Sequence, residues 1–253
     1  MALLEVRELS VRFGGVVALD RVSFTVEAGD VVGLIGPNGA GKTTLFNVIT
    51  RVYRPSGGSV SVDGSPVLKM APHEVIRRGV VRTFQNLALF RSMTVLENVL
   101  VGDHIGTRSR WLESSVPMPS ALNAESASRK RALEMLDFVG LAQQSDHPVA
   151  ALPFGTQKRV ELARALVSKP RLLLLDEPAG GISHNEVEGV ARLLRRIHSE
   201  LGITMLLVEH HMAFVMGISE RVVVLDFGKK IAEGSPAEVQ RNPAVIEAYL
   251  GAA

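Results

Sequence analysis

The chain has 253 residues, of which 46% are hydrophobic and 21% are charged. This composition supplies a sizeable core and excludes an intrinsically disordered protein. Because the formal net charge is only +2 and cysteine is absent, the totals argue against an extended nucleic-acid-binding surface, a disulfide framework and a thiolate metal site.

Predicted strands are spread along the chain, and none of its apolar runs is long enough to cross a membrane. The opening stretch MALLEVRELSVRF lacks the layout of a signal peptide, and no apolar run reaches the roughly 18 residues of a membrane-spanning helix. Short runs rich in valine, isoleucine and leucine predict strands at 22–26, 31–35, 60–62, 80–84, 172–175, 205–208 and 221–226. Such runs suit strands buried on both faces, so they predict a parallel sheet covered by helices.

A helical segment interrupts the strands. Residues 94–103 and 125–140 carry apolar residues at helical spacing, and Gly140 is expected just beyond the second helix. The stretch 108–120 between them has the serine and proline content of a loop. It contains Trp111, the only tryptophan, for which a partner contact and a small local core are equally good interpretations.

The C-terminal residues carry two helix-start signals. Ser235-Pro236 begins a capping-box pattern, in which the cap precedes a proline at the first helical position. Asn242-Pro243 repeats the cap and proline a few residues later. These patterns predict structure and carry no chemistry of their own.

Residues 36–44 read GPNGAGKTT and match the phosphate-loop pattern G-x-x-x-x-G-K-[ST]. Between a predicted strand and a helix, the loop's backbone N–H groups would surround a phosphate chain. Lys42 would reach the terminal phosphates, and Thr43 would offer its hydroxyl to Mg²⁺, which prefers oxygen ligands. The predicted nucleotide-binding residues are Gly36, Pro37, Asn38, Gly39, Ala40, Gly41, Lys42, Thr43 and Thr44.

The run LLLLDEP at 172–178 predicts a buried strand that ends in two carboxylates. Successive side chains of a strand point to opposite faces, so Asp176 and Glu177 would serve different partners. Asp176 is the better Mg²⁺ partner, and Glu177 is the candidate that polarises the attacking water. Two acids before a proline usually just end a strand; the phosphate loop is what favours the catalytic interpretation.

Five motifs follow one another along the chain: GPNGAGKTT, VVRTFQ, LPFGTQKRVELARAL, LLLLDEP and LLVEHH. Their order resembles the nucleotide-binding subunit of ATP-binding cassette transporters over nearly the whole chain. The resemblance implies an α/β fold, with a P-loop NTPase (RecA-like) core, an amino-terminal antiparallel β subdomain and an inserted α-helical subdomain. We expect one domain over 1–253, divided into a nucleotide-binding core at 1–88 and 151–234, a helical subdomain at 89–150 and a helical tail at 235–253.

The resemblance also implies roles for residues that carry little signal alone. Phe13 corresponds to the aromatic residue that stacks on adenine. Gln85 corresponds to the residue that binds ATP and its metal and joins them to the helical subdomain. His210 corresponds to the histidine that contacts the γ-phosphate and orients the catalytic water, so catalysis would rest on Glu177, His210 and Lys42. His211 is expected to be solvated.

The segment LPFGTQKRVELARAL corresponds to a loop and helix that face ATP held by a second subunit. Pro153, Phe154, Gly155 and Thr156 would present a helix N-terminus to that γ-phosphate, so that two nucleotides lie between cassettes arranged head to tail. The family pattern is Leu-Ser-Gly-Gly-Gln. Pro153 stands where the family has the serine, so a hydroxyl contact with phosphate is missing, which should weaken the closed pair of cassettes by about 1 kcal/mol. Thr156 is a candidate helix cap.

A second departure from the family lies at Ser183, which replaces an aspartate that crosses the dimer interface. Both departures leave a homodimer and a heterodimer open. In either case the resemblance implies a second ATPase subunit, integral membrane permease subunits and, indirectly, a periplasmic or extracellular solute-binding protein. The expected cofactors are ATP and Mg²⁺, and no nucleic acid is expected as a partner.

The segments RFGGVVALD, VEHHMAFVMGISERVVVLDFGKKIAEGSP and NPAVIEAYLG narrow the resemblance to ATPases of branched-chain, or hydrophobic, amino-acid importers. The implied enzyme hydrolyses ATP at the cytoplasmic face of the membrane. Importers of urea or short amides and exporters of lipid or lipopolysaccharide stay open as alternatives. A soluble cassette acting on ribosomes or DNA is disfavoured, because the chain has neither two cassettes nor a long coiled coil.

Overall fold

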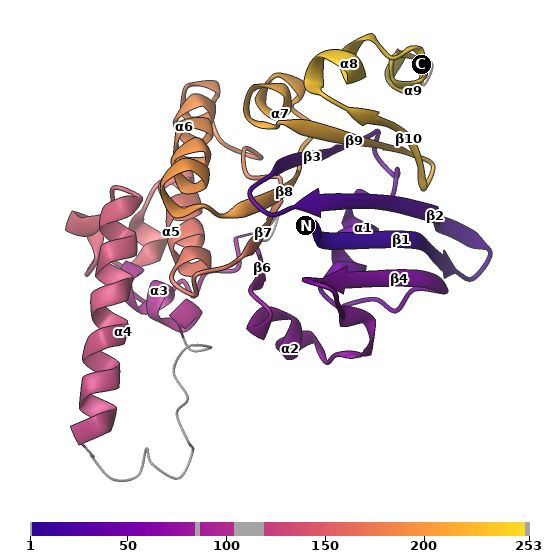
Figure 1. The fold of residues 1–253 in the computed structure, drawn as a ribbon. Coiled ribbons are helices and arrows are strands. Elements are labelled where there is room, and N and C mark those ends of the chain that lie inside the picture. Colours follow the sequence, from indigo (N-terminus) through magenta and orange to yellow (C-terminus); the bar gives the residue numbers. More distant parts are fainter. Residues whose placement is uncertain (1, 84–86, 104–118, 251–253) are drawn as a thin grey trace. The chain divides into compact units, whose positions relative to one another are not determined.

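The computed structural model describes residues 2–83, 87–103 and 119–250 (Figure 1). The chain forms two compact units. The first consists of Met1–Arg82, Arg171–Gly180 and His184–Ala253, and the second of Thr83–Pro170 and Gly181–Ser183. In this division the helix after residue 153 groups with the second unit.

An antiparallel sheet in the first unit has the strand order β2-β1-β4-β5. Its strands are β1 (Ala2–Phe13), β2 (Val16–Glu27), β4 (Gly57–Val62) and β5 (Ser65–Pro66). β1 pairs with both β2 and β4, and Leu4, Val6 and Leu9 point from it into the core. This sheet is the antiparallel subdomain that the family resemblance implies.

The other sheet of the first unit has the order β10-β9-β3-β8-β7-β6. Its strands are β3 (Val31–Ile35), β6 (Val80–Arg82), β7 (Leu172–Asp176), β8 (Thr204–Val208), β9 (Arg221–Asp226) and β10 (Lys229–Gly234). All pairs are parallel except β9 with β10. Every residue of β3, β7 and β8 is buried, which confirms the predicted parallel sheet.

Helices complete the first unit. They are α1 (Lys42–Ile49), α2 (Pro72–Arg77), α6 (His184–Leu201), α7 (Met212–Ile218), α8 (Pro236–Arg241) and α9 (Pro243–Leu250), with a 3₁₀ turn at Val67–Lys69. Both predicted helix starts near the C-terminus are confirmed. The Ser235 backbone N–H donates to Glu238 Oε2 at 2.7 Å in a capping box, and the Ala244 N–H donates to Asn242 Oδ1 at 3.0 Å.

The second unit is helical. It contains α3 (Val95–Asp103), α4 (Pro119–Phe138), α5 (Phe154–Leu166) and 3₁₀ turns at Ala142–Gln144 and Val149–Ala151. Buried Asp103, at the end of α3, forms an ion pair of 2.6 Å with Arg131 of α4. Gly140 follows α4 with a φ of +75°, as expected of a residue that ends a helix. Trp111 lies outside the described residues.

No helix in the described parts of the chain combines the length and the apolar character that crossing a membrane requires.

Candidate functional site

The phosphate loop connects the buried strand β3 to α1. Three of its glycines have positive φ angles, +151° at Gly36, +82° at Gly39 and +101° at Gly41, the N-cap of α1. Side chains disfavour such φ values, so the loop needs glycine to turn its backbone inward. The structure thus has the strand, loop and helix that GPNGAGKTT predicts, and α1 begins at Lys42.

Gly36 also leaves no room for a side chain. A Cβ atom there would lie 2.0 Å from the Leu225 carbonyl oxygen, whereas at Gly39 it would meet nothing within 4 Å. We expect Gly39→Ala to cost about 1–2 kcal/mol through its positive φ alone. Gly36→Ala should lower the free energy of unfolding by more than about 3 kcal/mol, because backbone must move. Urea denaturation tests this; equal losses would contradict the close approach.

Lys42 is held inside the loop that it follows. Its ammonium donates to the carbonyl oxygens of Gly36, at 2.6 Å, and Pro37, at 2.9 Å. Burial lowers the pKa of Lys42, and the negative charges of Glu177 and Asp176 offset part of that shift. A phosphate chain in the loop would supply the negative charge that favours the ammonium form.

Asp176 ends β7 and is 3% exposed. Its Oδ2 lies 2.6 Å from Arg82 Nη2, and Arg82 Nη1 donates to Asn47 Oδ1 at 2.7 Å. The guanidinium carbon is also 5.5 Å from the centroid of the Phe46 ring. Arg82 therefore joins β6, β7 and α1 around the carboxylate. The sequence reasoning missed it, although a charged residue in an apolar strand is a usable signal.

The predicted metal ligands fit Mg²⁺ by their chemistry. Asp176 offers a carboxylate, and Thr43 offers an exposed hydroxyl in the first turn of α1; both are hard oxygen donors. The third predicted ligand, Gln85, lies outside the described residues. Among the residues that are described, no three histidine or acidic side chains gather into a metal cluster.

Glu177 and His210 come together beyond the ends of β7 and β8. Glu177 Oε1 lies 3.9 Å from His210 Nδ1. The Glu177 side chain is 26% exposed and that of His210 is 64% exposed, so water can reach both. Glu177 has a φ of +49°, which is uncommon for a residue with a side chain.

His211 differs from its expected state. It is half-buried rather than solvated, because it precedes α7 as the N-cap residue and packs at the start of that helix.

Phe13 is not the core residue that an N-terminal strand alone would suggest. It ends β1 with 46% of its surface exposed. Its ring packs edge-on against Tyr53, with ring centroids 5.1 Å apart. An exposed aromatic face is compatible with stacking on a base.

The loop at Pro153–Thr156 belongs to the second unit. Pro153 is the N-cap of α5, Gly155 is buried, and Phe154 packs against Lys158, whose Nζ lies 5.6 Å from the ring centroid. The expectation that Thr156 caps the helix is wrong. The helix begins at Phe154, and the Thr156 N–H donates to the Pro153 carbonyl within the first turn.

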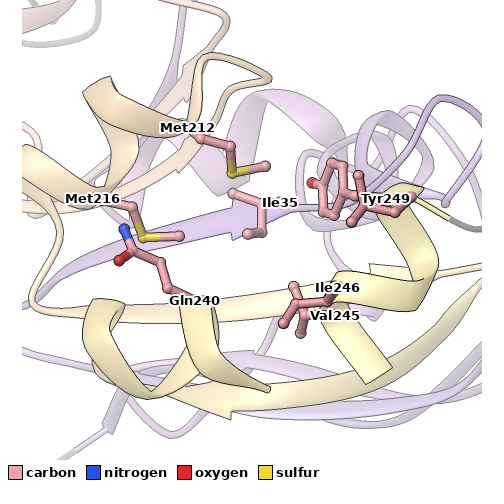
Figure 2. Close-up of a pocket in the computed structure, with 8 residues that line it drawn as sticks. Ile35, Met212, Met216, Gln240, Val245, Ile246 and Tyr249 are labelled. Carbon is pink, nitrogen blue, oxygen red and sulfur yellow. The ribbon is translucent and has the colours of Figure 1, made fainter. Parts of the chain in front are cut away.

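A small apolar pocket lies beside the C-terminal helices of the first unit (Figure 2). It has a volume of about 220 Å³ and is lined by Ile35, Met212, Met216, Gln240, Val245, Ile246, Tyr249 and Leu250. Burial raises the pKa of Tyr249 to about 12, and a hydrogen bond with the Gly36 backbone lowers it in part. Tyr249 of α9 and Ile35, the last residue of β3, thus line the same pocket.

The strand, phosphate loop and helix, together with the buried strand that ends in Asp176 and Glu177, define a P-loop nucleotide-binding protein. Residues 19–180 match the family model described as ABC transporter, and residues 229–253 match that of the branched-chain amino acid ATP-binding cassette transporter. The chain belongs to the ABC transporter family as an ATPase cassette.

Curated relatives match the full length of the chain. The high-affinity branched-chain amino acid transport ATP-binding protein BraF of Pseudomonas aeruginosa is 41% identical over 251 residues, covering 99% of this chain and 98% of BraF. The corresponding LivG of Escherichia coli is 40% identical over the same shares of both chains.

Solved structures agree with the fold. The ADP conformation of MJ1267, an ATP-binding cassette of an ABC transporter, superposes with a TM-score of 0.84 at 32% identity, over 99% of both chains. A dimeric post-hydrolysis state of the cassette MJ0796, bound to ADP and Pi, superposes with a TM-score of 0.77 at 27% identity. It covers 92% of this chain and 98% of MJ0796. The expected P-loop NTPase fold is confirmed.

Proposed function

We propose that this chain is the ATP-hydrolysing subunit that powers an importer of branched-chain amino acids, at the cytoplasmic face of the membrane. The observation that carries the proposal is full-length similarity to BraF and LivG, including the C-terminal segment 229–253. The phosphate loop that precedes α1 and the buried strand that ends in Asp176 support ATP hydrolysis.

Nucleotide binding uses the loop from Gly36 to Thr44. Its backbone N–H groups and the N-terminus of α1 attract the phosphates, and Lys42 pairs with their negative charge. Phe13 offers its exposed ring to the adenine. Mg²⁺ held by Thr43, Asp176 and Gln85 would neutralise phosphate charge.

Hydrolysis depends on the pair Glu177 and His210. Glu177 accepts a proton from the attacking water, whose oxygen then bonds to the γ-phosphorus as the bond to ADP breaks. His210 donates a hydrogen bond to the γ-phosphate and orients that water. The 3.9 Å separation of the two side chains allows both to reach one water molecule.

Transport would couple to this cycle through a second ATPase subunit. In our proposal the residues Pro153–Thr156 face the γ-phosphate of ATP on that partner, so ATP binding closes the pair and hydrolysis opens it. The dimeric structure of the MJ0796 cassette, bound to ADP and Pi, supports the pairing of two cassettes of this fold. The permease subunits would convert this closing and opening into movement of the cargo across the membrane.

Uptake by proteoliposomes tests the cargo. The chain is reconstituted with candidate permease subunits and a candidate solute-binding protein from the same organism, with MgATP enclosed so that it reaches the cassette. We expect ATP-dependent uptake of radiolabelled leucine and none with Glu177→Gln. Uptake of urea or acetamide without leucine would contradict the amino-acid assignment and leave the ATPase assignment intact. Export of a fluorescent lipid would identify the exporter alternative.

A further inference from the structure

We propose that Glu209 is a positioning residue for ATP hydrolysis, which holds His210 beside Glu177 by joining the two loops that carry them. The inference rests on the proposed function, since it assumes that Glu177 and His210 act on the γ-phosphate. It assigns to Glu209 a task distinct from theirs, because Glu209 is fully buried, at 0% exposure, and its hydrogen bonds come from backbone N–H groups.

The hydrogen bonds of Glu209 reach both loops. Its Oε1 accepts from the backbone N–H of Ala179 at 2.8 Å. Its Oε2 accepts from the backbone N–H of His210 at 2.9 Å and from that of His211 at 3.2 Å. One carboxylate therefore connects the loop after β7, which begins with Glu177, to the loop after β8, which carries His210.

The connection begins where the sheet ends. Asp176 and Val208 are paired across β7 and β8, and the Glu177 N–H donates to the Val208 carbonyl at 2.9 Å. Beyond this bond the chains leave the strands as separate loops. Glu209 continues the connection by side-chain hydrogen bonds, so the positions of Glu177 and His210 are set relative to each other.

The chemistry of the residue suits this task. A carboxylate accepts hydrogen bonds through both oxygens, and all three partners are N–H donors. Burying a carboxylate is unfavourable unless its oxygens accept hydrogen bonds. Loop conformations that keep the three N–H donors on Glu209 are therefore more stable than conformations that do not. Glu209 Oε2 also lies 3.6 Å from His210 Nδ1. It can therefore influence the orientation of the imidazole as well as the position of its backbone.

Glu209→Gln tests the inference at constant side-chain size. The amide keeps one acceptor oxygen and turns an NH₂ group toward an N–H donor, so one loop loses its anchor. We expect kcat to fall by about 10-fold to 100-fold, while the dissociation constant for MgATP changes less than about twofold. Glu209→Asp keeps the charge but is too short to span both loops, so it should also lower kcat with little change in the dissociation constant for MgATP. It replaces Glu209→Gln as the test if that variant does not fold.

The matched control is Asp103→Asn in the second unit. Asp103 is also a buried carboxylate with a charged partner, Arg131, so its loss should lower thermal stability without lowering kcat per folded molecule. An equal effect of Asp103→Asn and Glu209→Gln on kcat would overturn the positioning role, because general destabilisation would explain both.

A double-mutant cycle identifies the route of action. If Glu209 acts by placing His210, Glu209→Gln should reduce the residual single-turnover rate of His210→Ala by less than about twofold. If Glu209→Gln lowered the rate of His210→Ala by the same factor as it lowers the wild-type rate, the inference would be overturned and the proposed function would stay intact. Wild-type rates for both Glu177→Gln and His210→Ala would overturn the proposed function, and the inference with it.

Discussion

Replacing Glu177 with glutamine is expected to lower ATP hydrolysis by about 100-fold to 10,000-fold. The substitution keeps the size of the side chain and removes the base that accepts a proton from water. Nucleotide affinity should stay within about twofold of wild type, because the loop from Gly36 to Thr44 is unchanged. Phosphate release measures the rate, and a fluorescent ATP analogue measures the affinity.

Glu188→Gln is the matched control for this experiment. Glu188 lies on α6, has a side chain 59% exposed and forms surface ion pairs with Arg192 and Arg195. Its loss should leave the rate of hydrolysis unchanged, since such surface pairs contribute little. If Glu177→Gln retained more than about half of the wild-type rate, Glu177 would not be the general base.

Lys42→Ala should weaken ATP binding by about 10-fold to 100-fold, the loss expected for one charge-assisted hydrogen bond of about 1.5–3 kcal/mol. The ammonium already lies in the loop, donating to the carbonyl oxygens of Gly36 and Pro37. It could therefore turn to bound phosphates without a large rearrangement. Titration calorimetry with ATP measures the change.

Lys69→Ala controls for the loss of a lysine as such. Lys69 is an exposed residue at the end of a 3₁₀ turn in the same unit. It should leave the affinity unchanged. An affinity of Lys42→Ala within about twofold of wild type would mean that phosphate binding depends on the backbone alone.

Much of the fold could be predicted because the central strands are buried on both faces. Runs such as VVGLI at 31–35 are continuous and apolar, and they match β3 in full. The strands β1 and β10 have no such run, since β1 alternates buried and exposed residues and β10 begins with Lys229 and Lys230. Their pairing depends on partners distant in sequence, which composition does not reveal.

The site was predictable where residues act within one local motif. GPNGAGKTT and LLLLDEP carry their own context, so the strand ends and the phosphate loop follow from sequence. Arg82 and Glu209 were missed because their partners come from other elements. Arg82 contacts Asn47 and Asp176, and the partners of Glu209 include Ala179, thirty residues away.

The segment Pro153–Thr156 shows that residue type alone does not predict where a helix begins. Thr156 can cap a helix by residue type, but the backbone of Pro153 already occupies the N-cap position. The helix therefore starts three residues earlier than a Thr156 cap would require. That Pro153–Thr156 face the ATP of a second cassette is a prediction about an assembly of two chains.

The central claim is that two cassettes close on ATP, with Pro153–Thr156 of each facing the γ-phosphate on the other. Light scattering of Glu177→Gln with and without MgATP tests it most directly, because this variant should bind ATP and hydrolyse it very slowly. We predict a monomer without nucleotide and a dimer with MgATP. An ATP-saturated protein that keeps the mass of a monomer at every concentration would contradict closure between identical chains.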